Sequence, residues 1–280
     1  MNKTFTPLRY PGGKSQFYDC VVKIIVENNL NNITYIEPFA GGAGVAMRLL
    51  IEGLVDSIVI NDLDYAIFAF WYTVLNDTDW LIESIERCDI NIETWKIQKK
   101  IYLNPKEHSL KEVGFATFFL NRCNRSGILS AGPIGGKKQE GNYKIDCRFN
   151  KSTLISIIRM ISLNKNRIKL FNLDATDLIR MFKNETDTLW FIDPPYFGKG
   201  EELYKNSFSP SDHKHLSRII NQYLNNQAWI LTYDVCDDIF SLYNNHRFRK
   251  ISLSYSVGSK RKEEEYLFFN NLKINKELIL

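Results

Sequence analysis

Residues 189–196 read Leu189-Trp190-Phe191-Ile192-Asp193-Pro194-Pro195-Tyr196, an apolar run followed by an acid, two prolines and an aromatic ring. The apolar run is typical of a buried parallel strand, and ligands of open α/β sheets bind at the carboxyl ends of such strands. Asp193 and the Pro194 carbonyl can accept both hydrogens of an amino group on a flat ring, and Tyr196 can stack on that ring. Taken alone, the group fits a stiff turn equally well.

The rest of the chain alternates between strand and helix patterns. Strands are predicted at residues 33–37, 56–62, 168–173, 189–192, 229–233, 251–254 and 266–269, and helices at 45–52, 65–88 and 94–103. Ser209, followed by Pro210 and an acid three residues on, predicts a further helix start. This alternation predicts an α/β fold with a parallel, helix-covered sheet. Glycines and lysines at 127–141 indicate a loop or hairpin, so the middle of the chain is interpreted as an insertion.

Charge is distributed unevenly along the chain. The net charge is +4, but residues 96–169 hold sixteen basic and four acidic side chains, so this segment carries +12 and the remainder −8. A basic segment on an acidic body is typical of a polyanion site. The pattern favours nucleic acid as the partner over an evenly solvated surface.

Composition narrows the class of protein. The 280 residues are 44% hydrophobic and 24% charged, as in globular proteins. The sequence has no apolar stretch near the roughly 20 residues that span a bilayer, and its first residues do not resemble a secretory signal. Five scattered cysteines without CxxC spacing predict reduced thiols, with neither disulfides nor a metal site. His213 and His215 are interpreted as a solvated helix start.

The stretch Glu37-Pro38-Phe39-Ala40-Gly41-Gly42-Ala43-Gly44 follows the first predicted strand and opens a helix. Small residues let a ligand approach the backbone, and Asp62, at the end of the second strand, can accept hydrogen bonds from ribose hydroxyls. Because the stretch is not GxGxxG, it indicates a nucleoside-bearing cofactor without a pyrophosphate; a capped turn beside a surface acid is the alternative. Gly12-Gly13-Lys14-Ser15 is not a phosphate loop, since Leu8 stands where that motif needs glycine.

In order and spacing, several motifs resemble those of the Dam-like, α-group DNA adenine methyltransferases. The matching segments run nearly from end to end: Tyr10 to Lys14, Glu37 to Gly41, Asn61-Asp62, Leu120-Asn121-Arg122, Asp193 to Tyr196, Tyr204 to Phe208, and Lys260 to Glu265. The family's common Phe-x-Gly-x-Gly departs here to Phe39-Ala40-Gly41-Gly42-Ala43-Gly44, so the second glycine is displaced by one residue.

The resemblance implies a Rossmann-like, S-adenosylmethionine-dependent methyltransferase sheet with an inserted, basic, largely helical DNA-recognition subdomain. It places the catalytic domain at residues 1–70 and 166–280 and the recognition domain at 71–165. S-adenosylmethionine is the implied cofactor, with Tyr10, Lys14, Glu37, Pro38, Phe39, Gly41, Asp62 and Asp174 around it. The catalytic residues would be Asp193, Pro194, Pro195 and Tyr196.

The expected reaction is methylation of the amino nitrogen of an adenine flipped out of duplex DNA. Asp193 and the Pro194 carbonyl would accept the amino hydrogens, and Tyr196 would stack on the base. Arg122, Asn124 and Arg125, in a loop-like stretch, could read base edges or contact phosphates, and Lys137, Lys138 and Lys144 are expected at phosphates. Tyr204 and Asn206 lie either in a loop beside the extruded base or in an ordinary loop before Ser209.

Two other functions compete with this interpretation. Methylation of cytosine's amino group, or of RNA, is the alternative within the enzyme class, although Asp193 in place of the serine usual in the cytosine enzymes favours adenine. A non-catalytic DNA-binding regulator with the same fold is the alternative from another class, and the intact Asp193-to-Tyr196 motif argues against it. The expected protein is a cytoplasmic bacterial or phage enzyme, monomeric, without a membrane anchor, and with room for a cognate restriction endonuclease as partner.

Overall fold

The computed structural model describes residues 4–9, 17–197, 208–255 and 261–275. These residues form two compact units. The helical unit contains residues 4–9 and 64–166, and the sheet unit contains residues 17–63 and 167–275. The division inferred from sequence placed residues 1–70 with the sheet, whereas the structure groups residues 4–9 and the helix that begins at Tyr65 with the helical unit.

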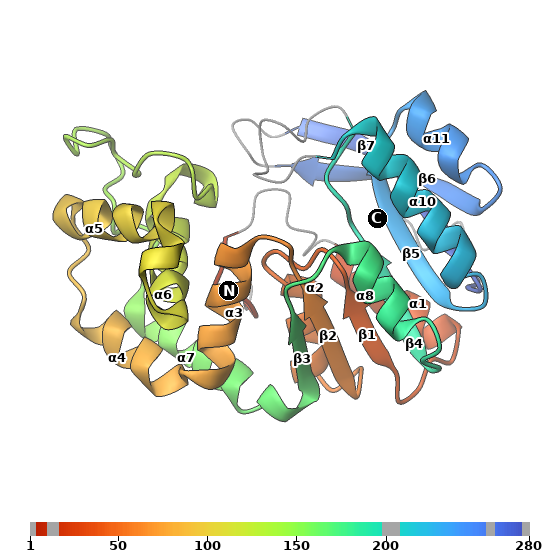
Figure 1. The fold of residues 1–280 in the computed structure, drawn as a ribbon, viewed down its shortest axis with the longest axis horizontal. Coiled ribbons are helices and arrows are strands. Elements are labelled where there is room, and N and C mark those ends of the chain that lie inside the picture. Colours follow the sequence, from red (N-terminus) through yellow and green to blue (C-terminus); the bar gives the residue numbers. More distant parts are fainter. Residues whose placement is uncertain (1–3, 10–16, 198–207, 256–260, 276–280) are drawn as a thin grey trace. The chain divides into compact units, whose positions relative to one another are not determined.

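Within the described residues, the sheet unit is built on seven strands in the order β3-β2-β1-β4-β5-β7-β6 (Figure 1). The strands are β1 (Thr34–Glu37), β2 (Ser57–Asn61), β3 (Ile168–Phe171), β4 (Thr188–Ile192), β5 (Ala228–Asp234), β6 (Arg247–Tyr255) and β7 (Arg261–Asn270). The first five strands in this order are parallel, β7 is antiparallel to β5, and β6 is antiparallel to β7. The predicted α/β fold is confirmed; the expectation of a wholly parallel sheet is wrong for β6 and β7.

Helices cover both faces of the sheet (Figure 1). They are α1 (Phe17–Glu27), α2 (Gly44–Ile51), α8 (Ala175–Phe182), α10 (Pro210–Tyr223) and α11 (Asp237–Tyr243). Apolar residues of α8, α10 and α11 pack with Trp190 and Ile192 in one core cluster. The ring of Phe191, the residue between them, lies 5.6 Å from that of Phe17 on α1, on the other face. Strand β4 is therefore buried on both faces, as its apolar run predicted.

The helical unit contains α3 (Tyr65–Asn76), α4 (Thr78–Arg87), α5 (Ile92–Leu103), α6 (Leu110–Cys123) and α7 (Lys151–Ser162). The predicted helix at 65–88 is two helices that meet at Asp77. Helices α3 and α6 pack closely because Gly114 lacks a side chain: a Cβ there would lie 2.2 Å from Oγ1 of Thr73. Sequence periodicity did not reveal α6, because nearly all its residues from Val113 onward are buried and no polar face marks its turns.

None of the helices formed by the described residues is long and apolar enough to cross a bilayer.

Candidate active site

Acidic side chains gather where three parallel strands of the sheet unit end. Glu37 ends β1, Asp62 follows β2 and Asp193 follows β4. Because β1 pairs with both β2 and β4, these residues stand at neighbouring strand ends. The carboxyl edge of an open α/β sheet is where ligands bind, so the structure brings together the three acids that the sequence pointed to.

Asp193 is half-buried and bonded to the neighbouring strand β5. Its Oδ1 accepts a hydrogen bond of 2.5 Å from the hydroxyl of Thr232, which is fully buried. Farther along, the amide of Phe197 donates a bond of 3.1 Å to Oδ1 of Asp234, the last residue of β5. The end of β5 therefore holds the segment 193–197 at both of its ends.

Tyr196 is held from strand β7. Its hydroxyl donates a hydrogen bond to Oε1 of Glu265. Tyr196 is 9% exposed and Glu265 is 1% exposed. In the sheet, Glu265 is the direct partner of Asp234. The family resemblance covered Glu265 without giving it a role; the structure makes it the acceptor for the tyrosine of the Asp-Pro-Pro-Tyr motif.

The glycine-rich turn after β1 is fastened to the end of β2. The amide of Gly41 donates a 2.8 Å hydrogen bond to Oδ2 of Asp62, and the amide of Ala40 donates a 2.9 Å bond to the carbonyl of Asn61. Gly41 has φ 47°, in the left-handed region that glycine tolerates. Ala43 stands at the position of the family's second glycine and has φ 45°. The displaced glycine therefore leaves a strained alanine at a backbone position suited to glycine.

This strain leads to a prediction about two alanines in the same element. Ala43→Gly relieves a left-handed conformation that costs about 1–2 kcal/mol in a non-glycine residue, which offsets the entropy that glycine loses on folding. We expect its free energy of unfolding to stay within about 0.5 kcal/mol of the parent. Ala46→Gly, also buried but inside α2, is the matched control and should cost about 1 kcal/mol or more. Equal losses in denaturant titrations would contradict the strain at Ala43.

Glu37 is buried and joins the turn to helix α2. Its Oε1 accepts a 3.2 Å hydrogen bond from the amide of Ala46 in the first turn of α2. Burial, with a smaller contribution from the negative charge of Asp193, raises the pKa of Glu37 to about 8, while Tyr35 and the Ala46 amide oppose the shift. The raised pKa means that Glu37 keeps its proton at neutral pH in the folded, ligand-free chain.

The raised pKa predicts a pH dependence of stability. The unfolded chain releases the Glu37 proton near pH 4.5 and the folded protein near pH 8, so between these values unfolding releases a proton. The contribution of Glu37 is complete below pH 4.5 and declines as pH rises to 8, by up to about 1.4 kcal/mol per pH unit. Denaturant titrations at several pH values should show this decline in the parent relative to Glu37→Gln, which cannot ionise. Parallel curves would contradict it.

Asn61 was matched in the sequence without a role, and the structure makes it the tie between three strand ends. It is 1% exposed. Its Nδ2 donates 2.9 Å bonds to the carbonyls of Pro38 and Leu173, and its Oδ1 accepts a 2.9 Å bond from the Leu173 amide. The loops after β1 and β3 are thereby fixed to the end of β2.

The other predicted cofactor residues occupy different surroundings. Pro38 is buried, and the half-buried ring of Phe39 lies 5.8 Å from that of Phe208. Asp174 is exposed and caps helix α8, where its Oδ1 accepts a 2.8 Å bond from the Thr176 amide. Tyr10, Lys14, Tyr204 and Asn206 lie outside the described residues.

His213 corrects the expectation of a solvated helix start. Helix α10 does begin after Ser209, with the predicted cap, but His213 is fully buried in its first turn, while His215 is exposed. Nδ1 of His213 lies 2.6 Å from the Tyr233 hydroxyl, and its ring packs beside Phe197 and Phe208. Burial lowers the pKa of His213. Among the described residues, no three or more His, Cys, Asp or Glu side chains form a group that could hold a metal ion.

In the helical unit, two of the predicted DNA contacts are engaged with the protein itself. Asn124 is fully buried; it accepts a 2.7 Å bond from Trp95 Nε1 and donates to the carbonyls of Ile128 and Leu129. Arg122 lies in α6, not in a loop, and its guanidinium donates to the Arg148 carbonyl; burial lowers the pKa of Arg122 to about 10. As the structure places them, both side chains hold the backbone of their own unit, whereas base readout would need them to face DNA.

The remaining predicted contacts are exposed. Arg125, Lys137, Lys138 and Lys144 all face solvent in the chain that follows α6. The loop that carries the lysines is organised from inside by Gln139, whose Oε1 accepts from the Ile145 amide and whose carbonyl accepts a 2.6 Å bond from Nζ of Lys144. Tyr143, 69% exposed, lies in the same loop and was not singled out from the sequence. An exposed aromatic ring among lysines suits contact with nucleic acid.

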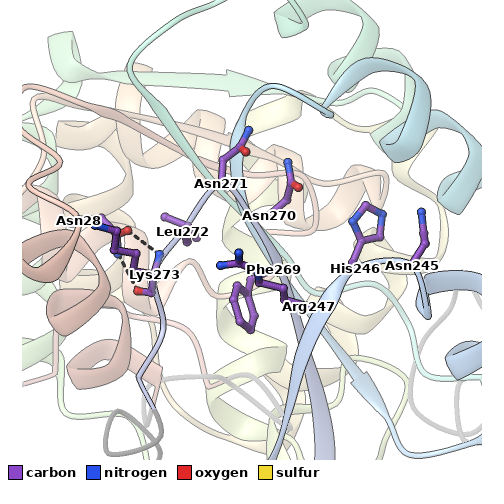
Figure 2. Close-up of a pocket in the computed structure, with 9 residues that line it drawn as sticks. All are labelled: Asn28, Asn245, His246, Arg247, Phe269, Asn270, Asn271, Leu272 and Lys273. Carbon is purple, nitrogen blue, oxygen red and sulfur yellow. Dashed lines mark hydrogen bonds between the residues drawn. The ribbon is translucent and has the colours of Figure 1, made fainter.

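A cavity of about 420 Å³ lies at the end of the sheet where the parallel strand β5 begins, between the residue after α1 and the start of β6 (Figure 2). The register places Asn270 beside Trp229, at the amino end of β5 and away from Asp193. The amides in its wall connect parts of the chain to one another: Asn28 exchanges bonds with Lys273, and Asn270 donates to the Asn225 carbonyl. This cavity is separate from the acids at the strand ends.

Comparisons with known proteins identify the family of this chain. The family model described as D12 class N6 adenine-specific DNA methyltransferase matches residues 10–266. A curated relative, the Type II methyltransferase M.MjaIII of Methanocaldococcus jannaschii, is 25% identical over 285 residues, which cover 92% of this chain and 96% of the relative. A solved structure of a candidate RNA methyltransferase from Pyrococcus horikoshii aligns over 96% of this chain and 86% of its own, with 9% identity and a TM-score of 0.44.

Proposed function

Because the chain belongs to the D12 class N6 adenine-specific DNA methyltransferase family, whose members depend on S-adenosylmethionine, we propose that its methyl-transfer site is the edge formed by Glu37, Asp62 and Asp193. The observation that carries this assignment is the position of Asp193. Its carboxylate stands at the end of the buried strand β4, partly exposed, next to the end of β1 that carries Glu37, and Asp62 follows β2, the strand on the other side of β1.

The residues at this edge fit S-adenosylmethionine. The cofactor carries ribose hydroxyls, whose hydrogen bonds a carboxyl group such as that of Asp62 can accept, and this edge offers Glu37 and Asp62 beside a turn of small residues. We assign Asp62 to the ribose, Glu37 and Gly41 to the turn that borders the cofactor, and Phe39 and Asp174 to its surroundings. Pro38, and Tyr10 and Lys14 outside the described residues, complete this proposed set. Bound there, S-adenosylmethionine supplies the methyl group, whose bond to the sulfonium sulfur breaks in the transfer.

The protein's own contribution is to prepare the adenine. Its amino nitrogen is a weak nucleophile because the lone pair is delocalised into the ring. Asp193 and the Pro194 carbonyl accept the two N–H groups, which localises the lone pair for attack; the nitrogen forms the new N–C bond and then releases one proton to solvent. Alignment of the reactants supplies much of the rate. A stacked, paired base cannot reach this position, so it is extruded and stacks on Tyr196.

We propose the exposed side chains Arg125, Lys137, Lys138 and Lys144 as the DNA contacts of the helical unit. Their exposure supports this assignment, and the net charge of +12 between residues 96 and 169 supplies the attraction for phosphates. Tyr204 and Asn206 are kept as proposed contacts to the extruded base.

Removal of two loop lysines is expected to weaken DNA binding without changing its sequence preference. Each phosphate contact contributes about 0.9 to the slope of log affinity against log salt, so Lys137→Ala with Lys138→Ala should make the slope shallower by about 2. Fluorescence anisotropy with target and scrambled duplexes measures this. The control replaces two exposed lysines of the sheet unit, Lys23 and Lys183, and should leave the slope unchanged. A loss confined to the target duplex would refute phosphate contact.

The partner and the assembly follow from the same proposal. A monomer that methylates one strand at a time needs only the residues assigned above. The Type II name of the Methanocaldococcus jannaschii relative supports a place in restriction and modification, with a cognate endonuclease as partner.

The decisive experiment for the function is a methylation assay. The purified chain is incubated with labelled S-adenosylmethionine and unmethylated DNA, the product is digested to nucleosides, and modified positions are mapped by single-molecule sequencing. Labelled N6-methyladenine in one recurring short context is the expected result. Label on cytosine, label only on RNA offered as competitor, or DNA binding without any product would overturn the proposal.

A further inference from the structure

We propose that Thr232 and Glu265 are positioning residues for methyl transfer: Thr232 orients the Asp193 carboxylate and Glu265 orients the Tyr196 ring. The inference rests on the proposed function and extends it to two residues on strands outside the Asp-Pro-Pro-Tyr motif.

The segment from Asp193 to Phe197 needs support from side chains. Pro194 and Pro195 have no amide hydrogen, so this stretch cannot be fixed by a regular backbone ladder. The end of strand β5 provides the support instead. The register pairs Ile192 with Leu231, which places Thr232 beside Asp193. Asp234, two residues farther along, receives the amide of Phe197.

Thr232 acts on the group that would touch the adenine. Its hydroxyl donates a 2.5 Å hydrogen bond to Oδ1 of Asp193 from a fully buried position. A carboxylate can accept from more than one donor, so this bond fixes its rotation while acceptor capacity for an N–H remains.

Glu265 acts on the base-stacking ring in the same way. It is 1% exposed on β7, and its Oε1 accepts the hydroxyl of Tyr196. Because β7 is antiparallel to β5 and pairs Glu265 with Asp234, the supports for Asp193, Phe197 and Tyr196 all come from one end of a strand pair. A phenol ring bonded at its hydroxyl has little freedom to tilt, so its face is prepared for the extruded base.

The test for Thr232 compares two substitutions that differ by the hydroxyl. Thr232→Val keeps the shape and removes the donor; Thr232→Ser keeps the donor. On a duplex that the parent methylates, we expect the single-turnover rate to fall by up to about a hundredfold for valine and to stay within a few-fold for serine. S-adenosylmethionine affinity and melting temperature should change little in both. Equal rates for valine and parent, or equal losses for valine and serine, would overturn the role of Thr232.

The test for Glu265 compares substitutions on both sides of its hydrogen bond with the Tyr196 hydroxyl. Tyr196→Phe keeps the ring, Glu265→Ala removes the acceptor, and Glu265→Gln retains an acceptor oxygen. A duplex with 2-aminopurine at the target adenine reports extrusion by a rise in fluorescence. We expect the phenylalanine and alanine variants to lose much of this rise, the double variant to be no worse than either, and glutamine to recover most of it. The role of Glu265 would be overturned if the double variant lost the product of the two single-variant losses in fluorescence rise, or if the rise were unchanged in the phenylalanine variant.

These outcomes separate the inference from the function on which it rests. Failure of the parent chain to methylate any duplex would refute the proposed function. Methylation by the parent with unchanged rates and fluorescence in the variants would leave the function intact and refute the positioning roles. Should Glu265→Ala or Thr232→Val fail to fold, Tyr196→Phe alone decides for Glu265 and Thr232→Ala decides for Thr232.

Discussion

Asp193→Ala is expected to lower the single-turnover rate of adenine methylation about a thousandfold, while S-adenosylmethionine and DNA affinities stay within a few-fold of the parent. The variant removes the acceptor that localises the amino lone pair, which matters most during transfer and little during binding. Asp193 is half-buried, and its removal leaves the Thr232 hydroxyl without this acceptor, so a modest loss of stability should accompany the loss of rate.

The chain offers graded controls for this result. Asp193→Asn retains a carbonyl oxygen that can accept one amino hydrogen but loses the charge, so its rate should lie between those of the parent and the alanine variant. Asp177→Asn removes the charge of an exposed acid on α8, paired only at the surface with Arg180, and should leave the rate unchanged. A substantial methylation rate in Asp193→Ala would refute Asp193 as the acceptor for the amino group.

The site depends on ties between strand ends more than on the motif itself. Asn61 joins the turn after β1 to the loop after β3, Asp62 receives the amide of Gly41, and Thr232 holds Asp193. Each of these bonds crosses from one strand end to the next. The acids of the proposed site are therefore fixed by neighbours within a single unit, as pre-organised catalysis requires.

Local patterns predicted the frame of this site well. Residues 189–192 are buried because β4 is central and covered on both faces, and a continuous apolar run is the direct mark of such a strand. The start of α10 at Pro210 followed from Ser209, because cap chemistry lies within a few residues of sequence. Patterns of this kind depend only on residues that are close together in the sequence, so they can be recognised before the fold is known.

Roles that depend on strand register could not be predicted in this way. Thr232 and Asp193 are 39 residues apart, and Tyr196 and Glu265 are 69 apart, so their contacts exist only once the sheet has formed. The antiparallel arrangement of β7 was also not visible from its own apolar pattern. The topology of the sheet determines which polar residues contact the Asp-Pro-Pro-Tyr motif. The hydrophobic periodicity of a single segment contains no information about that topology.

The segment 121–125 shows how residue type alone can mislead. Arginine and asparagine read base edges in nucleic-acid complexes, but the same multiple donors suit them to hold backbone carbonyls inside a protein. Burial separates the two uses here. Asn124 is fully buried and Arg125 is exposed, although they are adjacent in the chain.

Asn124→Ala is therefore expected to destabilise the helical unit by about 3 kcal/mol, whereas Arg125→Ala should change its stability by less than about 0.5 kcal/mol. The asparagine change leaves Trp95 Nε1 and the carbonyls of Ile128 and Leu129 without the amide that joins them. Denaturant titration followed by Trp fluorescence, with limited proteolysis within residues 64–166, would measure the difference in stability.

DNA binding should respond in the opposite order. Because Arg125 faces solvent among the basic residues, Arg125→Ala should weaken binding by about 1–3 kcal/mol in a variant that remains folded. Asn124→Ala, measured at a temperature where it is folded, should bind DNA nearly as the parent does, because its amide does not reach the surface. If Asn124→Ala were stable but had lost its DNA sequence preference, the result would indicate that Asn124 reads a base. In that case the loop at 127–134 would have to open when DNA binds.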